Sequence, residues 1–296
     1  MKVEPIVWTE EYNVGNEIID GAHKKLFSIL RQILVEENMD SAKVEATCVE
    51  TIKYLKKYTV QHFAEEEAYM RKIKYPGYMM HKELHDNIRE VALPKMEENL
   101  VNTKFSEEAV FSLVSFLSGW LTGHIMIEDR AITGRALSRY NNDHKYSDNH
   151  ELLDVEFQKF IHDLFRIKSA CSNKYYSGEE LKCAHYFEFV FETEDDEHIN
   201  KSVIVFSENK LMTFMMSKII GIKIDKIDKE SLLAYIQVLI YMTKAALAIT
   251  NPELLLVYKT TKTFNAKEYK QIFHTIEPRY SMKWQTDEGS MGIIIE

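Results

Sequence analysis

Apolar and polar residues in the first 135 positions recur with the period of an α-helix, in four stretches separated by short breaks. The pattern predicts helices from about residue 20, over 40–72, over 78–99 and after Ser106. The first eighteen residues lack this period, so we expect an extended arm there. Four amphipathic helices joined by short connections predict an antiparallel four-helix bundle.

Prolines mark two points within this pattern. Tyr75-Pro76-Gly77 separates the second helix from the third. Pro94 lies inside the third pattern, where it lacks a donor N–H and clashes with the preceding turn. We therefore expect Pro94 to kink or shorten the third helix.

The pattern changes after Arg139. A polar, turn-prone stretch indicates a linker over 140–149. Beyond it, the pattern predicts a helix over 151–169, strands over 185–192 and 203–206, two helices over 210–220 and 229–249, and strands over 254–258 and 292–295. The predicted organisation is an all-α four-helix bundle over 1–139, the linker, and an α+β domain over 150–296.

Composition narrows the classes of function and location. The formal net charge of −9 argues against a general binder of nucleic acid or of anionic membranes. Three cysteines without metal or redox spacing fit a reducing compartment. The apolar run 232–249 is nearly long enough to span a membrane, but Gln237, Thr243 and Lys244 favour a buried helix. The start has no apolar run suited to a signal peptide, so we expect a cytoplasmic protein.

Two pairs of metal-capable side chains occupy successive helices of the bundle. His62 and Glu66 form one pair, and His81 and His85 form the other, each four residues apart. Four steps of about 100° bring both members of a pair to the same side of an α-helix. Imidazole and carboxylate together suit iron, manganese or zinc better than calcium or magnesium.

All five histidines of the bundle fall on or beside an apolar stripe. They are His23, His62, His81, His85 and His124. Burying five imidazoles without a metal ion would be costly, so we predict a buried metal site. The other six histidines lie beyond the bundle without ligand spacing, and we interpret them as surface or structural residues.

The carboxylate that accompanies His124 is less certain from geometry, because two candidates follow it. Glu128 stands at i+4, as in the other pairs, whereas Asp129 stands at i+5, about 140° around an ideal helix. Asp129 reaches the site only from its edge or on a differently wound helix. The apolar face drifts onto Ile132, which puts Glu128 on a solvent-facing flank. Glu65 and Glu67, beside Glu66, are interpreted as solvent charges.

The first 135 residues resemble the hemerythrin family, in particular its bacterial members. The matching residues are Trp8, Ile19-Asp20-x-x-His23, His62-x-x-x-Glu66, His81-x-x-x-His85 and His124-x-x-x-x-Asp129. The resemblance implies reversible dioxygen binding, with electrons supplied by two irons. It implies that one iron is held by His81, His85 and His124, the other by His23 and His62, and that Glu66 and Asp129 bridge both.

Counting ligands leaves one open position. Two irons with about six ligands each need about twelve bonds. Five imidazoles and two bridging carboxylates supply nine, and a solvent-derived oxo or hydroxo bridge supplies two more. The open position falls on the iron with two histidines, and we expect Trp120, Leu121 and Ile125 to line its ligand pocket. Ferritin-like oxidases use repeated Glu-x-x-His pairs, which are absent from this sequence, so binding is favoured over oxygenase chemistry.

The run 203–221 and the long helix after it resemble the CheX-like family, which dephosphorylates chemotaxis response regulators. That family works with a Glu and an Asn three residues apart on the long helix. Here, residues 235–244 contain Gln237 as their only amide and no acid. We expect a partner-binding domain in place of a phosphatase, with Met212, Met215 and Met216 filling its core.

The combined expectation is an oxygen or redox sensor whose C-terminal domain binds a signalling partner. The alternatives are oxygen storage or delivery, a diiron peroxidase or oxidase, and a response-regulator phosphatase controlled by the iron site. Storage has no need of a second domain, and the missing acid–amide pair argues against the phosphatase.

Overall fold

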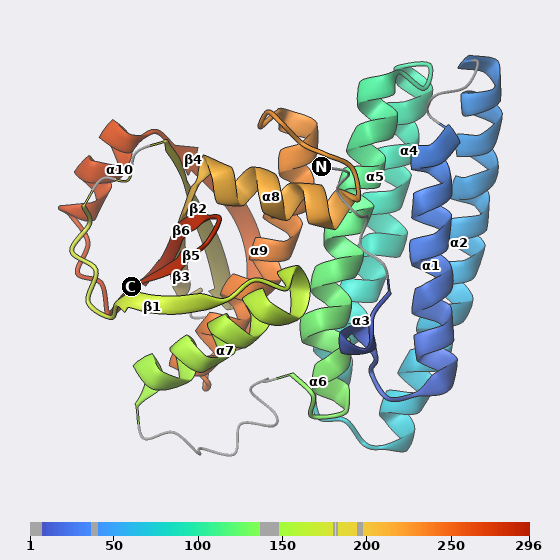
Figure 1. Cartoon of the computed structure of the whole chain (residues 1–296). Coiled ribbons are helices and arrows are strands. Elements are labelled where there is room, and N and C mark those ends of the chain that lie inside the picture. The colour runs from blue at the N-terminus through green and yellow to red at the C-terminus, as the bar shows by residue number, and fades with distance from the viewer. Residues whose placement is uncertain (1–7, 37–40, 137–147, 180, 182, 194–197) are drawn as a thin grey trace.

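The computed structural model describes residues 8–36, 41–136, 148–179, 181, 183–193 and 198–296. A helical bundle forms one side of the molecule, and an antiparallel sheet with its own helices forms the other (Figure 1). The predicted fold class, a four-helix bundle followed by an α+β region, is confirmed.

The bundle consists of four long rods, two of which change their winding part-way. A short 3₁₀ helix, η1 (Glu10–Tyr12), precedes them. The first two rods are regular α-helices, and the third and fourth each contain a π-helical segment. In chain order the elements are α1 (Glu17–Glu36), α2 (Ser41–Lys72), α3 (Tyr78–Asn87), η2 (Ile88–Ala92), α4 (Leu93–Asn102), α5 (Glu107–Gly123), η3 (His124–Asp129) and α6 (Arg130–Ile132).

Side chains at the helix starts explain where the rods begin. The Ser106 hydroxyl accepts a hydrogen bond from the backbone N–H of Ala109 and so caps α5, as predicted. In α1, the buried Asp20 carboxylate accepts hydrogen bonds from the backbone N–H groups of Val14 and Gly15. Asp20 thereby holds the N-terminal arm against α1.

The third rod is longer than we expected from the position of Pro94. It continues past Pro94 to Asn102, so of the two effects predicted for Pro94, a kink or a shortening, the shortening is wrong. The π-helical segment Ile88–Ala92 directly precedes the proline, and Pro94 lies in the first turn of α4. The change to π-helical winding thus falls just before Pro94, where the missing N–H interrupts the intrahelical hydrogen bonds.

The second part is built on one six-stranded sheet. Its spatial order is β1-β5-β6-β3-β2-β4, with every neighbouring pair antiparallel. The strands are β1 (Ser169–Asn173), β2 (Ala184–Thr193), β3 (Asn200–Glu208), β4 (Leu256–Phe264), β5 (Tyr280–Thr286) and β6 (Gly289–Ile295). The helices are α7 (Asn149–Phe165), α8 (Asn209–Ile220), α9 (Lys229–Thr250) and α10 (Ala266–Phe273).

Alternation along the strands gives the sheet two covered faces. On β2, Phe187, Phe189 and Phe191 point into the large core shared with the bundle, whereas Tyr186 points to the opposite face. That opposite face packs under α10, where Tyr269 stacks on Tyr186 with ring centroids 4.1 Å apart. The three methionines of α8 are fully buried, as predicted.

Helix α9 lies between the bundle and the sheet, with α5 on one side and the strands on the other (Figure 1). Both α9 and the rod over residues 107–132 are long and apolar enough to cross a membrane. Within the most apolar stretch of each helix, however, 83% of the residues of that rod and 56% of those of α9 are buried inside the protein. Their apolar character is therefore explained by packing, as predicted for 232–249.

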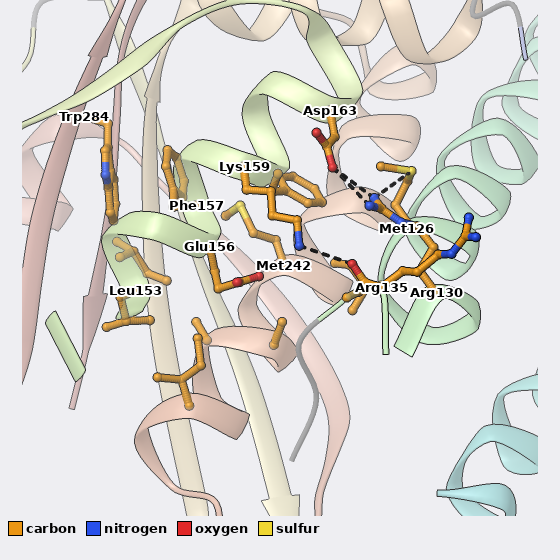
Figure 2. Close-up of a pocket in the computed structure, with 17 residues that line it drawn as sticks. Met126, Arg130, Arg135, Leu153, Glu156, Phe157, Lys159, Asp163, Met242 and Trp284 are labelled. Atoms are coloured by element: carbon orange, nitrogen blue, oxygen red, sulfur yellow. Dashed lines mark hydrogen bonds and ion pairs between the residues drawn. The ribbon is translucent and has the colours of Figure 1, made fainter. Parts of the chain in front are cut away.

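The two parts also enclose a cavity between η3, α7 and α9 (Figure 2). Met126 lines it from η3, Phe157 from α7 and Met242 from α9. At its edge the two terminal guanidinium nitrogens of Arg130, Nη1 and Nη2, donate to the Asp163 carboxylate at 3.1 Å each. The predicted linker, apart from residues 148 and 149, lies outside the described residues.

Candidate metal centre

Seven side chains from four helical segments converge in the middle of the bundle. α1 contributes His23, α2 contributes His62 and Glu66, α3 contributes His81 and His85, and η3 contributes His124 and Asp129. Each of the seven is at most 3% exposed. The structure therefore brings together all the residues predicted as ligands.

The donor atoms fall into two groups that share a carboxylate. One group contains Glu66, His81, His85 and His124, and the other contains His23, His62 and Glu66. In the first group, the Nε2 atom of His85 lies 3.1 Å from that of His81 and 3.2 Å from that of His124. The histidines are thus divided three to two, the same division that the resemblance implied.

Asp129 also faces both groups. Its Oδ1 atom lies 3.0 Å from His124 Nε2 and 3.3 Å from His81 Nε2, whereas its Oδ2 atom lies 3.2 Å from His23 Nε2. Two oxygens of one carboxylate therefore point at histidines of different groups. This is the arrangement that a carboxylate bridging two metal ions requires.

The π-helical winding of η3 explains how Asp129 reaches the site. In a π-helix the hydrogen bonds run from residue i to i+5, so the turn is wider than in an α-helix. Consistent with this, the Arg130 N–H bonds to the Ile125 carbonyl. The wider turn places Asp129, five residues after His124, on the same side of the rod.

Glu128 does not face the site. Its carboxylate accepts a hydrogen bond from Lys244 Nζ of α9 at 2.8 Å, and its side chain is 17% exposed. The interpretation of Glu128 as a solvent-facing flank residue is therefore wrong. A helical wheel could not show the second domain covering that flank.

The interpretation of Glu67 as a solvent-exposed charge is also wrong. It is 8% exposed, and its Oε1 atom lies 3.4 Å from His85 Nδ1. Metal-ligating histidines usually donate their second N–H to a carboxylate or carbonyl. Glu67 is placed to hold His85 in this way, although its position beside Glu66 gave no sign of it.

Burial and charge set the protonation of the histidines. Burial lowers the pKa of His62 to about 3, so its imidazole is neutral and has a free lone pair at neutral pH. Burial also opposes the charge on His81, but the Asp129 and Glu66 carboxylates outweigh it and raise the pKa of His81 to about 10. A metal ion bound there would displace that proton and take over the attraction of both carboxylates.

Aromatic rings pack around the imidazoles. Trp8 lies 6.1 Å from His23, Phe63 stacks on His85 at 3.9 Å, and Trp120 stacks on His124 at 4.6 Å between centroids. Of the predicted pocket residues, Trp120 and Leu121 line an apolar cavity. Ile125 is fully buried but does not line it. The cavity is formed by Leu26, Leu30, Leu55, Thr59, Ile88, Leu93, Leu117, Trp120 and Leu121.

This cavity adjoins the site on one side. Leu26 follows His23 by three residues, Thr59 precedes His62 by three, and Leu121 precedes His124 by three. Because the rods run antiparallel, these positions lie at the same level, about one turn from the histidines. A small apolar molecule in the cavity would lie next to the metal-binding atoms.

The second part of the chain adds a contact to the metal site that the sequence did not predict. The Tyr241 hydroxyl of α9 lies 3.5 Å from His124 Nδ1, and the two rings are 6.0 Å apart. Burial, together with the Glu128 and Asp129 carboxylates, raises the pKa of Tyr241 well above its usual value, so the phenol is neutral. No local pattern could have shown this contact, because Tyr241 is 117 residues away.

The donor set fits two transition-metal ions. Imidazole nitrogens bind such ions at about 2.0–2.1 Å, so two ligands at right angles on one ion lie about 3 Å apart. The nitrogen–nitrogen and nitrogen–oxygen separations here are 3.0–3.5 Å. Among the described residues, no donor makes a hydrogen bond of normal geometry to the oxygens of Glu66 and Asp129, which face the histidine nitrogens of the site at 3.0–3.5 Å. Their lone pairs are left for metal ions.

The other six histidines do not contribute. His150, His162, His185, His198 and His274 lie in the second part, and none belongs to a metal-ligating group found among the described residues. His144 is outside the described residues. Among the described histidines, the geometry expected of metal ligands is therefore confined to the five histidines of the bundle.

Known proteins resemble the bundle. The family model of the hemerythrin HHE cation binding domain matches residues 14–136. Bacteriohemerythrin of Clostridium acetobutylicum is 30% identical over 128 residues, which are 42% of this chain and 95% of that protein. Bacteriohemerythrin of Pseudomonas aeruginosa is 30% identical over 124 residues, 42% of this chain and 76% of that protein. The matched region holds all seven ligand candidates.

Solved structures match the other half of the chain at a much lower level. Chemotaxis protein CheX from Vibrio vulnificus has a TM-score of 0.36 and 9% identity, covering 50% of this chain and 95% of that one. CheX from Desulfovibrio desulfuricans has a TM-score of 0.35 and 10% identity, covering 50% and 97%.

Proposed function

The chain belongs to the hemerythrin family through residues 14–136, and from this premise we propose that it is a non-haem diiron protein that binds dioxygen reversibly. Two irons would supply the electrons and the open coordination position that dioxygen binding needs. The observation that carries the proposal is the unequal division of five histidines around two shared carboxylates.

The division assigns different tasks to the two histidine groups. His81, His85 and His124 would hold one iron firmly, whereas His23 and His62 leave the other iron one ligand short. Glu66 and Asp129 would bridge the ions together with a solvent-derived oxo or hydroxo group. The apolar cavity lined by Leu26 and Leu121 adjoins the site and suits a small neutral ligand.

We propose that the protein acts as an oxygen or redox sensor in the cytoplasm. The feature that favours sensing over storage is the close packing of α9 against the rod that carries His124 and Asp129. A storage protein has no need for a second domain in contact with its metal site. The region 150–296 would bind a signalling protein, and neither nucleic acid nor membrane is an expected partner.

Phosphatase activity in the second domain is disfavoured by its long helix. The central part of α9, residues 235–244, contains no acid, and Gln237 is its only amide. An acid–amide pair on that helix is what the CheX-like enzymes use, so a partner-binding role is proposed for the domain.

An absorption spectrum tests the oxygen-binding proposal. The purified full chain is reduced without oxygen, exposed to air and then returned to argon. We expect charge-transfer bands that appear on exposure, disappear under argon and return on a second cycle. Irreversible bleaching or release of iron on the first exposure would support an oxidase or peroxidase and overturn the proposal.

Single-ligand variants test the division of the histidines. His62→Ala is expected to abolish the oxygenated spectrum while the protein retains about one iron per chain, because three histidines still hold the other ion. His81→Ala removes a ligand from the three-histidine group and is expected to lower retention of both irons. Equal loss of both irons in the two variants would show that the division is wrong.

A further inference from the structure

Two side chains of α9 reach the ligand-bearing segment η3 of the bundle. Tyr241 approaches the His124 ring, and Lys244 pairs with Glu128. Tyr241 and Lys244 are three residues apart and so lie on one face of α9. Tyr241 is 3% exposed. The second domain therefore forms part of the wall of the metal site.

The two nitrogens of His124 have different surroundings. Its Nε2 atom faces the site, 3.0 Å from Asp129 Oδ1 and 3.2 Å from His85 Nε2. A neutral imidazole that binds a metal through Nε2 carries its proton on Nδ1. That N–H faces the Tyr241 oxygen at 3.5 Å, a contact longer than a typical N–H···O hydrogen bond.

Of the other four histidines of the site, only His85 has a hydrogen-bond partner at Nδ1 among the described residues. Among the described residues, the Nδ1 atoms of His23, His62 and His81 have no hydrogen-bond partner. His85 is held by Glu67 from within the bundle. His124 is thus distinguished by a partner that comes from the second domain.

The close approach of α9 is built into α5. Gly119 and Gly123 are four residues apart and face α9, as in other small-xxx-small helix contacts. A Cβ atom at Gly119 would overlap the Ala234 backbone, and one at Gly123 would overlap the Tyr241 ring. Glycine costs about 1 kcal/mol relative to alanine inside a helix, so this pair is explained by the contact it allows.

The opposite side of α9 contacts the sheet. The Tyr235 ring lies 5.9 Å from that of Phe187 on β2, and Leu239, one turn further along the same side of α9, is fully buried. A displacement of Tyr241 would move a helix that is packed tightly on both sides.

We propose that Tyr241 is a positioning residue for His124 and that this contact transmits the state of the iron site to α9 and the sheet. The proposal rests on the proposed diiron function. Tyr241 accepts the Nδ1–H of His124 and fixes the ring orientation. A shift of the His124 ring would move that N–H, and Tyr241 would pass the displacement to α9.

The test removes one oxygen atom. Tyr241→Phe keeps the ring that fills the space beside Gly123, and Tyr235→Phe is the matched control on the same helix, also fully buried but facing the sheet. Partners of ligating histidines typically change metal affinity by about 10–100-fold. We expect Tyr241→Phe to release iron to a competing chelator about 10-fold faster than wild type, and Tyr235→Phe to release it at the wild-type rate.

Hydrogen–deuterium exchange tests the transmission. In the reduced wild-type chain, dioxygen is expected to change exchange in peptides of α9 and β2, and Tyr241→Phe is expected to lose this change. Wild-type release rates in Tyr241→Phe would overturn the positioning role. An unchanged exchange response in that variant would overturn the transmission. If wild type itself holds no pair of irons, the diiron function has failed, a result that does not depend on either variant.

Discussion

Asp129 and Glu128 are adjacent in sequence but perform different tasks. Asp129 is fully buried between the two histidine groups, whereas Glu128 turns away and pairs with Lys244. A bridging carboxylate contributes to both metal ions at once. The partly buried ion pair of Glu128 with Lys244 contributes to the packing of the second part against the bundle. We expect the metal site to stay unchanged when this ion pair is lost.

Alanine substitutions separate these tasks. Asp129→Ala is expected to lose the oxygenated spectrum and most of the iron. Glu128→Ala is expected to keep two irons and the spectrum, but to lower the free energy of unfolding by about 1–3 kcal/mol, because Lys244 is left partly buried without its partner. The iron content and the free energy of unfolding in urea are measured for both variants. The account is contradicted if Glu128→Ala loses iron and Asp129→Ala keeps it.

Glu67 supplies a second test at the residue scale. Glu67→Gln weakens the acceptor for His85 Nδ1 without changing the size of the side chain. We expect iron release to a chelator to become about 10-fold faster. Glu65→Gln, exposed on the same helix, is the control and is expected to behave as wild type. Equal rates in the two variants would remove the role assigned to Glu67.

At the scale of elements, helical periodicity predicted most of the bundle and placed six of the seven ligand candidates, all but Asp129, on or beside its apolar faces. His62, Glu66, His81 and His85 follow from i,i+4 spacing on ordinary α-helices. Asp129 did not, because its position depends on the π-helical turn of η3, and a sequence pattern assumes a constant winding. The resemblance to the hemerythrin family, and not helical periodicity, indicated Asp129 as a ligand.

Short and distant features were missed for a different reason. β1, β5 and α10 have only five to eight residues, too few for a period to stand out. Tyr241 and Lys244 act across more than 100 positions of sequence. Such contacts are decided by how complete elements pack, and a local pattern contains no information about them.

Two glycines that lie within helices test the importance of close helix packing. Gly123→Ala places a methyl group against the Tyr241 ring and is expected to lower the free energy of unfolding by about 1–3 kcal/mol. Gly21→Ala in α1 meets nothing within 4 Å and is expected to raise it by about 0.5–1 kcal/mol. Denaturant unfolding of both variants gives the comparison. Stabilisation by Gly123→Ala would mean that α5 and α9 are further apart than described.

At the scale of the whole molecule, the bundle and the second part are joined by ion pairs as well as by a common core. Glu11 of the N-terminal arm pairs with Arg166 at the end of α7. Arg130 pairs with Asp163, also on α7. The arm that packs Trp8 on His23 is therefore tied to the second part of the chain.

The Glu11 pair predicts a dependence on pH. Hydrogen bonding to Arg166 lowers the pKa of Glu11 from 4.5 to about 2. A depressed carboxyl pKa stabilises the fold above the unfolded-state value, and the contribution is lost as pH falls through the folded-state value. The difference in unfolding free energy between wild type and Glu11→Gln is expected to be about 0.5 kcal/mol at pH 7, since the pair is partly exposed. It should shrink between pH 4.5 and 2, and a difference that grows on acidification would contradict this.

We propose that seven side chains of one bundle hold a pair of iron ions. The most direct measurement is the metal content of the full chain, expressed with ample iron and analysed for iron and zinc. The account predicts two irons per chain in wild type, and a marked loss of both in Glu66→Ala, since Glu66 belongs to both donor groups. One zinc per chain, or no bound metal, would contradict it.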